Sequence, residues 1–93
     1  MDNNEKVMWI ACGAFLNIAM NENNKIIIAK EGGIPIVLNI MKLHASKNEE
    51  VMDNVCLALA NIAMNENNRI LIAKEGGIPI LLNTMKLVAL MQI

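Results

Sequence analysis

The chain lacks an excess of either charge, a long apolar run and most aromatic side chains. It has no Tyr, one Trp and one Phe, and its eight basic and nine acidic residues give a net charge of −1. This balance provides no electrostatic basis for binding nucleic acid or anionic lipid. No stretch approaches the ~18 apolar residues of a membrane helix, and the start MDNNEKVMW has no pattern of a secretory signal. We therefore expect neither nucleic acid nor a membrane as partner.

The chain is also poor in residues that carry chemistry. Its two cysteines, Cys12 and Cys56, and its single histidine, His44, are too few for a four-ligand zinc site. We interpret the cysteines as buried thiols in a reducing, intracellular compartment, cytoplasmic and/or nuclear. Acids such as Glu49 and Asp53 suit the first turn of a helix, where they face its positive end. We expect no cofactor, no metal and no enzyme activity.

What the sequence does contain is a repeat. The octapeptide AKEGGIPI occurs at Ala29–Ile36 and again, 44 positions later, at Ala73–Ile80. Sliding the chain by that offset aligns residues 4–44 with residues 48–88, and 29 of the 41 aligned pairs are identical. A helical period of about 40–47 residues is typical of HEAT and armadillo arrays. Methionines recur in the same slots, which we interpret as core packing: Met8 and Met52, Met20 and Met64, Met41 and Met85.

The letters of one unit predict a short helix followed by a tight turn. Asn21 is a suitable cap for a helix that contains the apolar run Ile26–Ala29. Gly32 then supplies the left-handed position at the end of the helix, and Gly33 lets the chain reverse. The duplicated octapeptide is therefore predicted to be the turn between the first two helices of each unit.

Two further helices complete the predicted unit. Pro35 suits the start of the second helix, and we expect Ile34 to lie outside helical geometry because it precedes a proline. The break HASKNEE then offers two candidate caps, Ser46 and Asn48, for a longer third helix that runs to about Met64. Because HEAT repeats have two helices, three helices per unit favour the armadillo type.

At this point the residues resemble a known family. The strings NEEV, LALANIA, NENNR and AKEGGIPILLNTMKL, in this order, are similar to the armadillo repeat consensus, and the first copy matches it through AFLNIA and AKEGGIPIVLNIMKL. The resemblance implies an all-α, right-handed α-solenoid with three helices in each 44-residue repeat. It divides the single domain 1–93 into the third helix of a preceding unit (5–20), a repeat (21–64) and a partial C-terminal repeat (65–93).

The same resemblance implies a protein-binding or peptide-binding groove lined by the third helices. Asn17 and Asn61 occupy the slot whose amide bonds the backbone of an extended peptide in peptide-binding members. One turn earlier those members often have Trp, where this chain has Gly13 and Leu57. The single Trp9 lies a further turn back and aligns with Asp53. These departures weigh against the recognition of basic peptides that is typical of nuclear-import adaptors.

One feature supports the groove independently of the family. Of the 12 aligned pairs that differ, six lie within Trp9–Leu16 of the predicted third helix. Variation on one helix of a constant scaffold is typical of a variable binding surface. Drift of an exposed end helix is the alternative, although drift would bring in polar residues.

Both ends of the array are apolar. The tail VALMQI replaces the break of the first unit, so we expect the last helix to continue to the end of the chain, with a self-association surface at Leu87, Leu90, Met91 and Ile93. Because a repeat buries its apolar faces only against its neighbours, we expect a homodimer or a higher homo-oligomer. Two functions remain open: a protein-binding module that self-associates through its ends, or a designed or truncated minimal scaffold whose main property is assembly.

Overall fold

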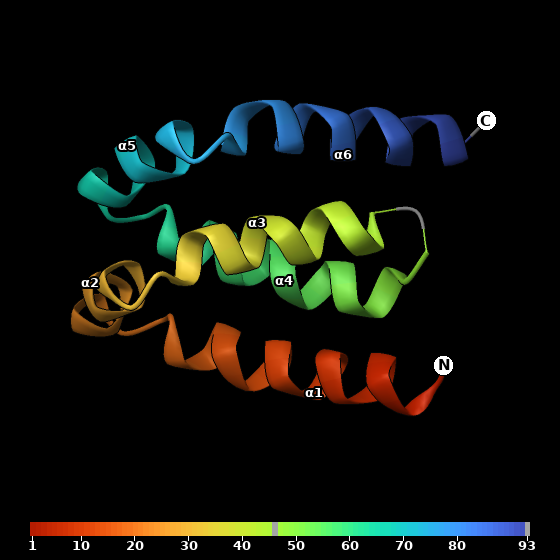
Figure 1. Ribbon diagram of the computed structural model, residues 1–93, viewed down its shortest axis with the longest axis horizontal. Coiled ribbons are helices and arrows are strands. Elements are labelled where there is room, and N and C mark those ends of the chain that lie inside the picture. The colour runs from red at the N-terminus through yellow and green to blue at the C-terminus, as the bar shows by residue number, and fades with distance from the viewer. Residues whose placement is uncertain (46, 93) are drawn as a thin grey trace.

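The computed structural model describes residues 1–45 and 47–92, and all the regular secondary structure in this part of the chain is α-helical. Figure 1 shows the long helices lying across the molecule one above another, with the two short helices together at one end. The helices are α1 (Asn3–Ile18), α2 (Glu22–Lys30), α3 (Gly33–His44), α4 (Glu49–Ile62), α5 (Glu66–Lys74) and α6 (Gly77–Met91).

Asparagine caps set the starts of three helices, because an amide oxygen accepts a bond from a backbone N–H that has no partner within the helix. Asn21 accepts from the N–H of Asn24 at 3.1 Å, and Asn65 repeats this bond for α5. Asn48 accepts from the N–H of Val51 at 3.0 Å and is therefore the cap of α4. The other candidate, Ser46, lies outside the described residues.

The glycine turn has the geometry that the sequence predicted, except at one residue. Gly32 has φ of 77°, which is the left-handed region, and a Cβ on Gly33 would lie 2.9 Å from the backbone oxygen of Ile28. The prediction for Ile34 was wrong, since α3 already begins at Gly33 and Ile34 is a buried helical residue. Pro35 is tolerated there because the N–H groups of a helix's first turn have no helical partner.

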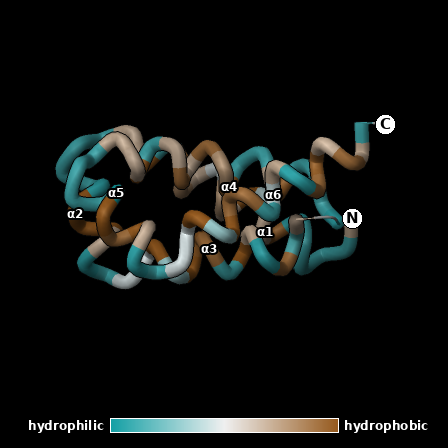
Figure 2. The backbone as a smooth tube through the Cα atoms, turned by 90° about the horizontal axis from the view of Figure 1, so that it is seen from above, coloured by the Kyte–Doolittle hydropathy of each residue, from teal (hydrophilic) through white to brown (hydrophobic). Residues whose placement is uncertain are grey.

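The helices form two layers with the core between them. α1 packs on α4 in one layer, α3 packs on α6 in the other, and α3 also packs on α4 across the layers. Figure 2 shows the hydrophobic stretches gathering toward the inside and hydrophilic stretches along the outer rims. The largest fully buried side chains come from α3 and α4: Ile34, Val37, Leu38, Met41, Val51, Val55 and Ile62.

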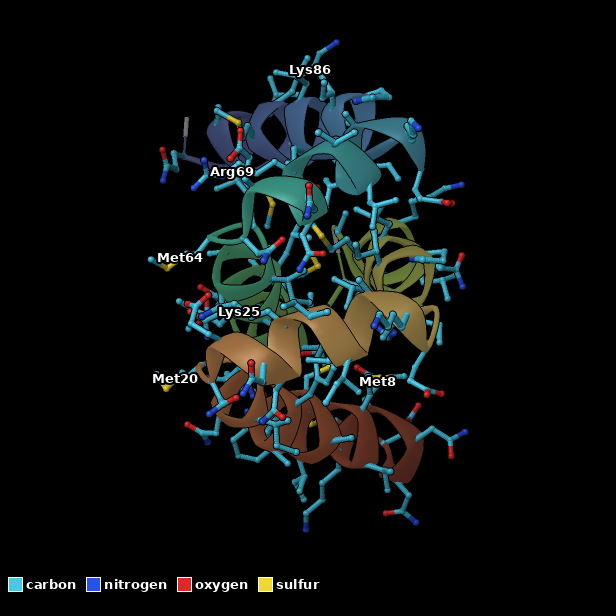
Figure 3. The ribbon with its side chains drawn as sticks, turned by 90° about the vertical axis from the view of Figure 1, so that its left-hand side faces the viewer. Met8, Met20, Lys25, Met64, Arg69 and Lys86 are labelled. Carbon is cyan, nitrogen blue, oxygen red and sulfur yellow. The ribbon has the colours of Figure 1, made fainter. Side chains whose placement is uncertain are left out.

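The interpretation of the paired methionines as core residues holds only in part. Met41 and Met52 are buried, but Met20 and Met64 are exposed, and Figure 3 shows both projecting from the same edge of the molecule. Each of these two follows the last turn of its helix, α1 or α4, so it is not on that helix's buried face. Met85, the counterpart of Met41, is exposed as well.

Candidate functional site

Two rows of side chains run along α1 and α4, the neighbouring helices of one layer. In each row the residues follow one another at four-residue intervals, which keeps them on one side of the helix. α1 packs directly on α4, and Asn61 reaches the backbone of Leu16 beside Asn17, so the rows are adjacent at that point. They are made of the six predicted groove residues: Trp9, Gly13 and Asn17 on α1, and Asp53, Leu57 and Asn61 on α4.

The two asparagines of these rows make different hydrogen bonds. Nδ2 of Asn61 donates to the carbonyl oxygen of Leu16 across the helix stack at 3.0 Å. Nδ2 of Asn17 donates to Gly13 O within its own helix at 3.1 Å, and the residue is exposed. One N–H of Asn61 Nδ2 thus holds α4 against α1, and its second N–H and its Oδ1 are left to bond a ligand.

A third asparagine, which the sequence analysis did not single out, connects α4 to α1 beside the rows. Nδ2 of Asn54 donates to the carbonyl oxygen of Trp9 at 2.9 Å. A Cβ on Gly13 would lie 3.3 Å from that same nitrogen, so Asn54 also packs beside the glycine. The signal in the sequence was its alignment with Ile10, a polar residue opposite an apolar one.

The row on α4 borders a groove. Asp53 and Leu57 line it, together with Cys56 from α4 and Met91 from α6, and its volume is about 760 Å³. Burial, helped by the nearby Asp53 carboxylate, raises the pKa of the Cys56 thiol. Burial likewise raises the pKa of the Cys12 thiol. Both thiols are free and remain protonated at neutral pH.

Beyond the groove, α6 exposes an apolar face whose counterpart on α3 is buried. Three residues that contribute to the core from α3 recur unchanged in α6, 44 positions later. The exposed fractions of these pairs differ widely: 2% for Ile34 and 56% for Ile78, 2% for Leu38 and 60% for Leu82, 0% for Met41 and 65% for Met85.

The opposite end of the molecule has a matching exposed face on α1. Val51 and Ile62 of α4 are fully buried, whereas the identical residues of α1, Val7 and Ile18, are 65% and 53% exposed. Beside them a shallow apolar pocket of about 300 Å³ opens between α1 and α3, lined by Phe15 and Ile36 among others. The two exposed faces are defined here as the α6 face (Ile78, Leu82, Met85) and the α1 face (Val7, Ala11, Ile18).

The predicted self-association residues lie next to the α6 face. Leu87 is half-buried, and Leu90 and Met91 are exposed in the last turn of α6. Ile93 lies outside the described residues. α6 does continue to Met91, three residues beyond the counterpart of the end of α3, as the absence of a helix break in VALMQI predicted.

At the end of the molecule formed by α2 and α5, a basic side chain of each unit donates hydrogen bonds to carbonyl groups at the end of the preceding helix. Lys25 is buried, and its Nζ donates to Met20 O at 3.1 Å and to Glu22 Oε1 at 2.8 Å. Arg69, in the same slot, is exposed and its Nε donates to Ala63 O. Cations at this position stabilise the negative end of a helix, and Figure 3 shows the two one above the other. These bonds join the helices of a unit to the unit before.

Among residues 1–45 and 47–92, no group of three or more His, Cys, Asp or Glu side chains lies close enough to hold a metal ion. No helix in this described part is long and apolar enough to cross a membrane.

The comparisons with known proteins agree with the resemblance in the sequence. Residues 21–64 match the model of the Armadillo/beta-catenin-like repeat family, and this segment holds α2, α3 and α4. No curated protein and no solved structure matches the chain. Over this segment, which is just under half of the chain, the protein is therefore similar to an armadillo repeat.

Proposed function

We propose that the chain is a non-enzymatic module that binds an extended peptide or protein along α1 and α4 and self-associates through its apolar ends. The observation that carries this proposal is the pair of adjacent rows, which present an amide at the same slot of two stacked helices. An amide offers a donor and an acceptor to a peptide unit without reading its side chain.

The remaining residues of the rows give the surface its selectivity. Trp9 and Leu57 are exposed and provide apolar contact area, whereas Asp53 places a carboxylate beside Leu57. An aromatic anchor is a common centre of binding energy in protein interfaces. We infer a ligand with an apolar side chain near Trp9 and a donor near Asp53.

The wider architecture that this function needs is also a proposal. The two layers of helices continue, in this proposal, as a right-handed α-solenoid with three helices per repeat, so that the rows lie on its concave side. Two free thiols suit a reducing intracellular compartment, cytoplasmic and/or nuclear. Neither nucleic acid nor a membrane is proposed as a partner, since the net charge is close to zero.

The test is selection of extended peptides from a displayed library, followed by titration of a selected peptide while the fluorescence of Trp9 is recorded. Trp9 is the only tryptophan, so the signal reports on the α1 row. Replacing Asn17 and Asn61 together with Ala should abolish binding without changing helicity. The matched control is Asn39→Ala with Asn83→Ala, since these asparagines are exposed in equivalent positions of α3 and α6. Equal affinity of both double variants would overturn the proposal.

A second candidate function is assembly without a ligand, the property expected of a minimal scaffold. It is favoured by the exposed apolar side chains in the last turn of α6. In that case the library should yield no peptide whose binding depends on Asn17 and Asn61. Leu90→Glu combined with Met91→Lys should dissolve the oligomer, as measured by light scattering.

A further inference from the structure

We propose that the chain assembles head to tail, with α1 of a second copy lying against α4 and α6 so that α5, α6 and this α1 form one complete repeat shared by two chains. This inference rests on the self-association part of the proposed function and specifies which surfaces pair. The occupant of the α6 face is thus a second copy of the chain, contributed through its α1 face.

The α3–α4 contact within the chain is the template for this pairing. Leu38 and Met41 of α3 and Val51 and Ile62 of α4 are buried, and these two helices pack on each other. The same residue types occupy the same positions of the α6 face and the α1 face, where they are exposed. One chain therefore carries both halves of an interface that it already forms once, and these halves lie at its opposite ends (Figure 1).

Three apolar positions that differ between the template and the proposed interface change in opposite directions, one becoming smaller and two larger. Val55 of α4 becomes the smaller Ala11 in α1, whereas Leu59 becomes the larger Phe15. On the other side, Val37 of α3 becomes Leu81 in α6. Swaps that keep the total apolar volume are the ones that cores tolerate best.

The open groove lies where the third helix of a repeat would pack. The groove of about 760 Å³ lies between α4 and α6, and the equivalent position one repeat earlier, beside α1 and α3, is occupied by α4. Reciprocally, the pocket between α1 and α3 of the second copy is the place where α6 of the first copy would lie. Both layers would thus continue across the junction without a change of order.

The hydrogen bonds that join successive units also have their partners at the shifted positions. Asn61 donates to Leu16 O and Asn68 donates to Lys25 O. One repeat further, the donors are Asn17 and Asn24 of the second copy, and the acceptors are the carbonyl oxygens of Ala60 and Arg69. Two of the side-chain bonds that hold the stack together are therefore available between chains.

Such an interface is heterologous, because one copy contributes its α6 face and the other its α1 face. A heterologous contact leaves a free face at each end of the pair, so assembly continues into a ring or an open filament. This separates the proposal from a two-fold dimer, in which the same face would meet itself.

The experiment blocks one face at a time. Leu82→Glu blocks the α6 face and Ile18→Glu blocks the α1 face, and multi-angle light scattering gives the mass of each variant and of their mixture. Each variant alone should be a monomer. The 1:1 mixture should form a dimer of twice 10.2 kDa and nothing larger, because it contains one intact face of each kind. Met85→Lys and Val7→Lys repeat the test on other residues of the same faces should a glutamate lower helicity.

The matched control is Ile70→Glu. Ile70 is 54% exposed, and its counterpart Ile26 stays exposed although α5 packs on α2, so this variant should assemble like the unaltered chain. A second readout is thiol labelling. Cys12 is buried, whereas Cys56, in the same slot of α4, lines the open groove, so Cys56 should lose its reactivity with a thiol reagent by at least about tenfold when the dimer forms.

Three results would overturn the proposal. They are a dimer of either blocked variant alone, a mixture that stays monomeric, and an unaltered chain that is monomeric at every concentration. In the first two cases the unaltered chain can still self-associate, so the proposed function survives while the head-to-tail pairing fails. The third result removes self-association as well, and with it the part of the proposed function on which this inference rests.

Discussion

α3 and the first twelve residues of α6 share nine of twelve residues, yet one is the centre of the core and the other a surface helix. The sequences GIPIVLNIMKLH and GIPILLNTMKLV differ only by V/L, I/T and H/V. α3 has α4 against it and α6 has no helix in that place. Burial of this shared sequence is therefore decided by the helices that pack against it, and a repeat array depends on such contacts between stacked helices.

The largest difference in the loss of stability between the two copies is expected for Leu38 and its counterpart Leu82. Leu38→Ala should lower the free energy of unfolding of the monomer by about 2–5 kcal/mol, because it leaves a cavity in the core. Leu82→Ala should change it by less than about 0.5 kcal/mol, since the side chain is exposed. Urea unfolding at low protein concentration measures both. Equal losses would show that α6 is covered within the monomer.

The next largest difference in the loss of stability is expected for Lys25 and its counterpart Arg69. Lys25→Ala removes a buried ammonium that bonds Met20 O and the carboxylate of Glu22, and hydrogen bonds to charged groups contribute about 1.5–3 kcal/mol. Arg69→Ala should cost less, because Arg69 is exposed. The same urea titration compares the two. A larger loss for Arg69 would contradict an energetic effect of the difference in burial between Lys25 and Arg69.

Asn61 and its counterpart Asn17 should differ less in the loss of stability on replacement by Ala. Asn61→Ala removes the bond to Leu16 O across the stack and should cost about 0.5–1.5 kcal/mol. Asn17→Ala removes only a bond within its own exposed helix and should be close to neutral in the monomer. Thermal unfolding followed by circular dichroism resolves the two. If Asn17→Ala were the more harmful change, α1 would have a partner that this account does not include.

The smallest effect is expected from the cysteines, through pH. Burial raises the pKa of both thiols, so below about pH 8.5 the folded and unfolded chains both hold these protons. Above that pH the unfolded chain releases them first, and stability should fall as pH rises. Replacing Cys12 and Cys56 with Ser should flatten this decline. In the monomer, Cys56 should react with a thiol reagent before Cys12, because Cys12 is buried and Cys56 lines the groove.

The local structure could be predicted from single residues. Few other local structures fitted Asn21 and Asn65 at the caps and Gly32 at the turn. Only a few residue types are favourable at a helix cap or in a left-handed backbone conformation. The start of α3 was misplaced because the rule for residues before proline is weaker within the first turn of a helix, where Ile34 is held by burial. The choice of Asn48 as the cap of α4 required the structure.

The candidate site was less accessible to sequence reasoning. The periodicity placed Asn17 and Asn61 in equivalent slots, but it could not show that Asn61 is bonded across the stack while Asn17 is not. Asn54 was missed because its partner is a backbone carbonyl, which every residue has. Apolar periodicity marks a helix face as one that is covered somewhere, and it cannot tell Met41 from Met85. Only the helices that surround each residue in the structure distinguish buried Met41 from exposed Met85.

The central claim is that the exposed faces of α6 and α1 are two halves of an interface. The most direct test is the light-scattering mass of the unaltered chain over a dilution series from millimolar to nanomolar. The account predicts a mass that rises with concentration from 10.2 kDa through multiples of that value. A constant 10.2 kDa at every concentration would contradict it.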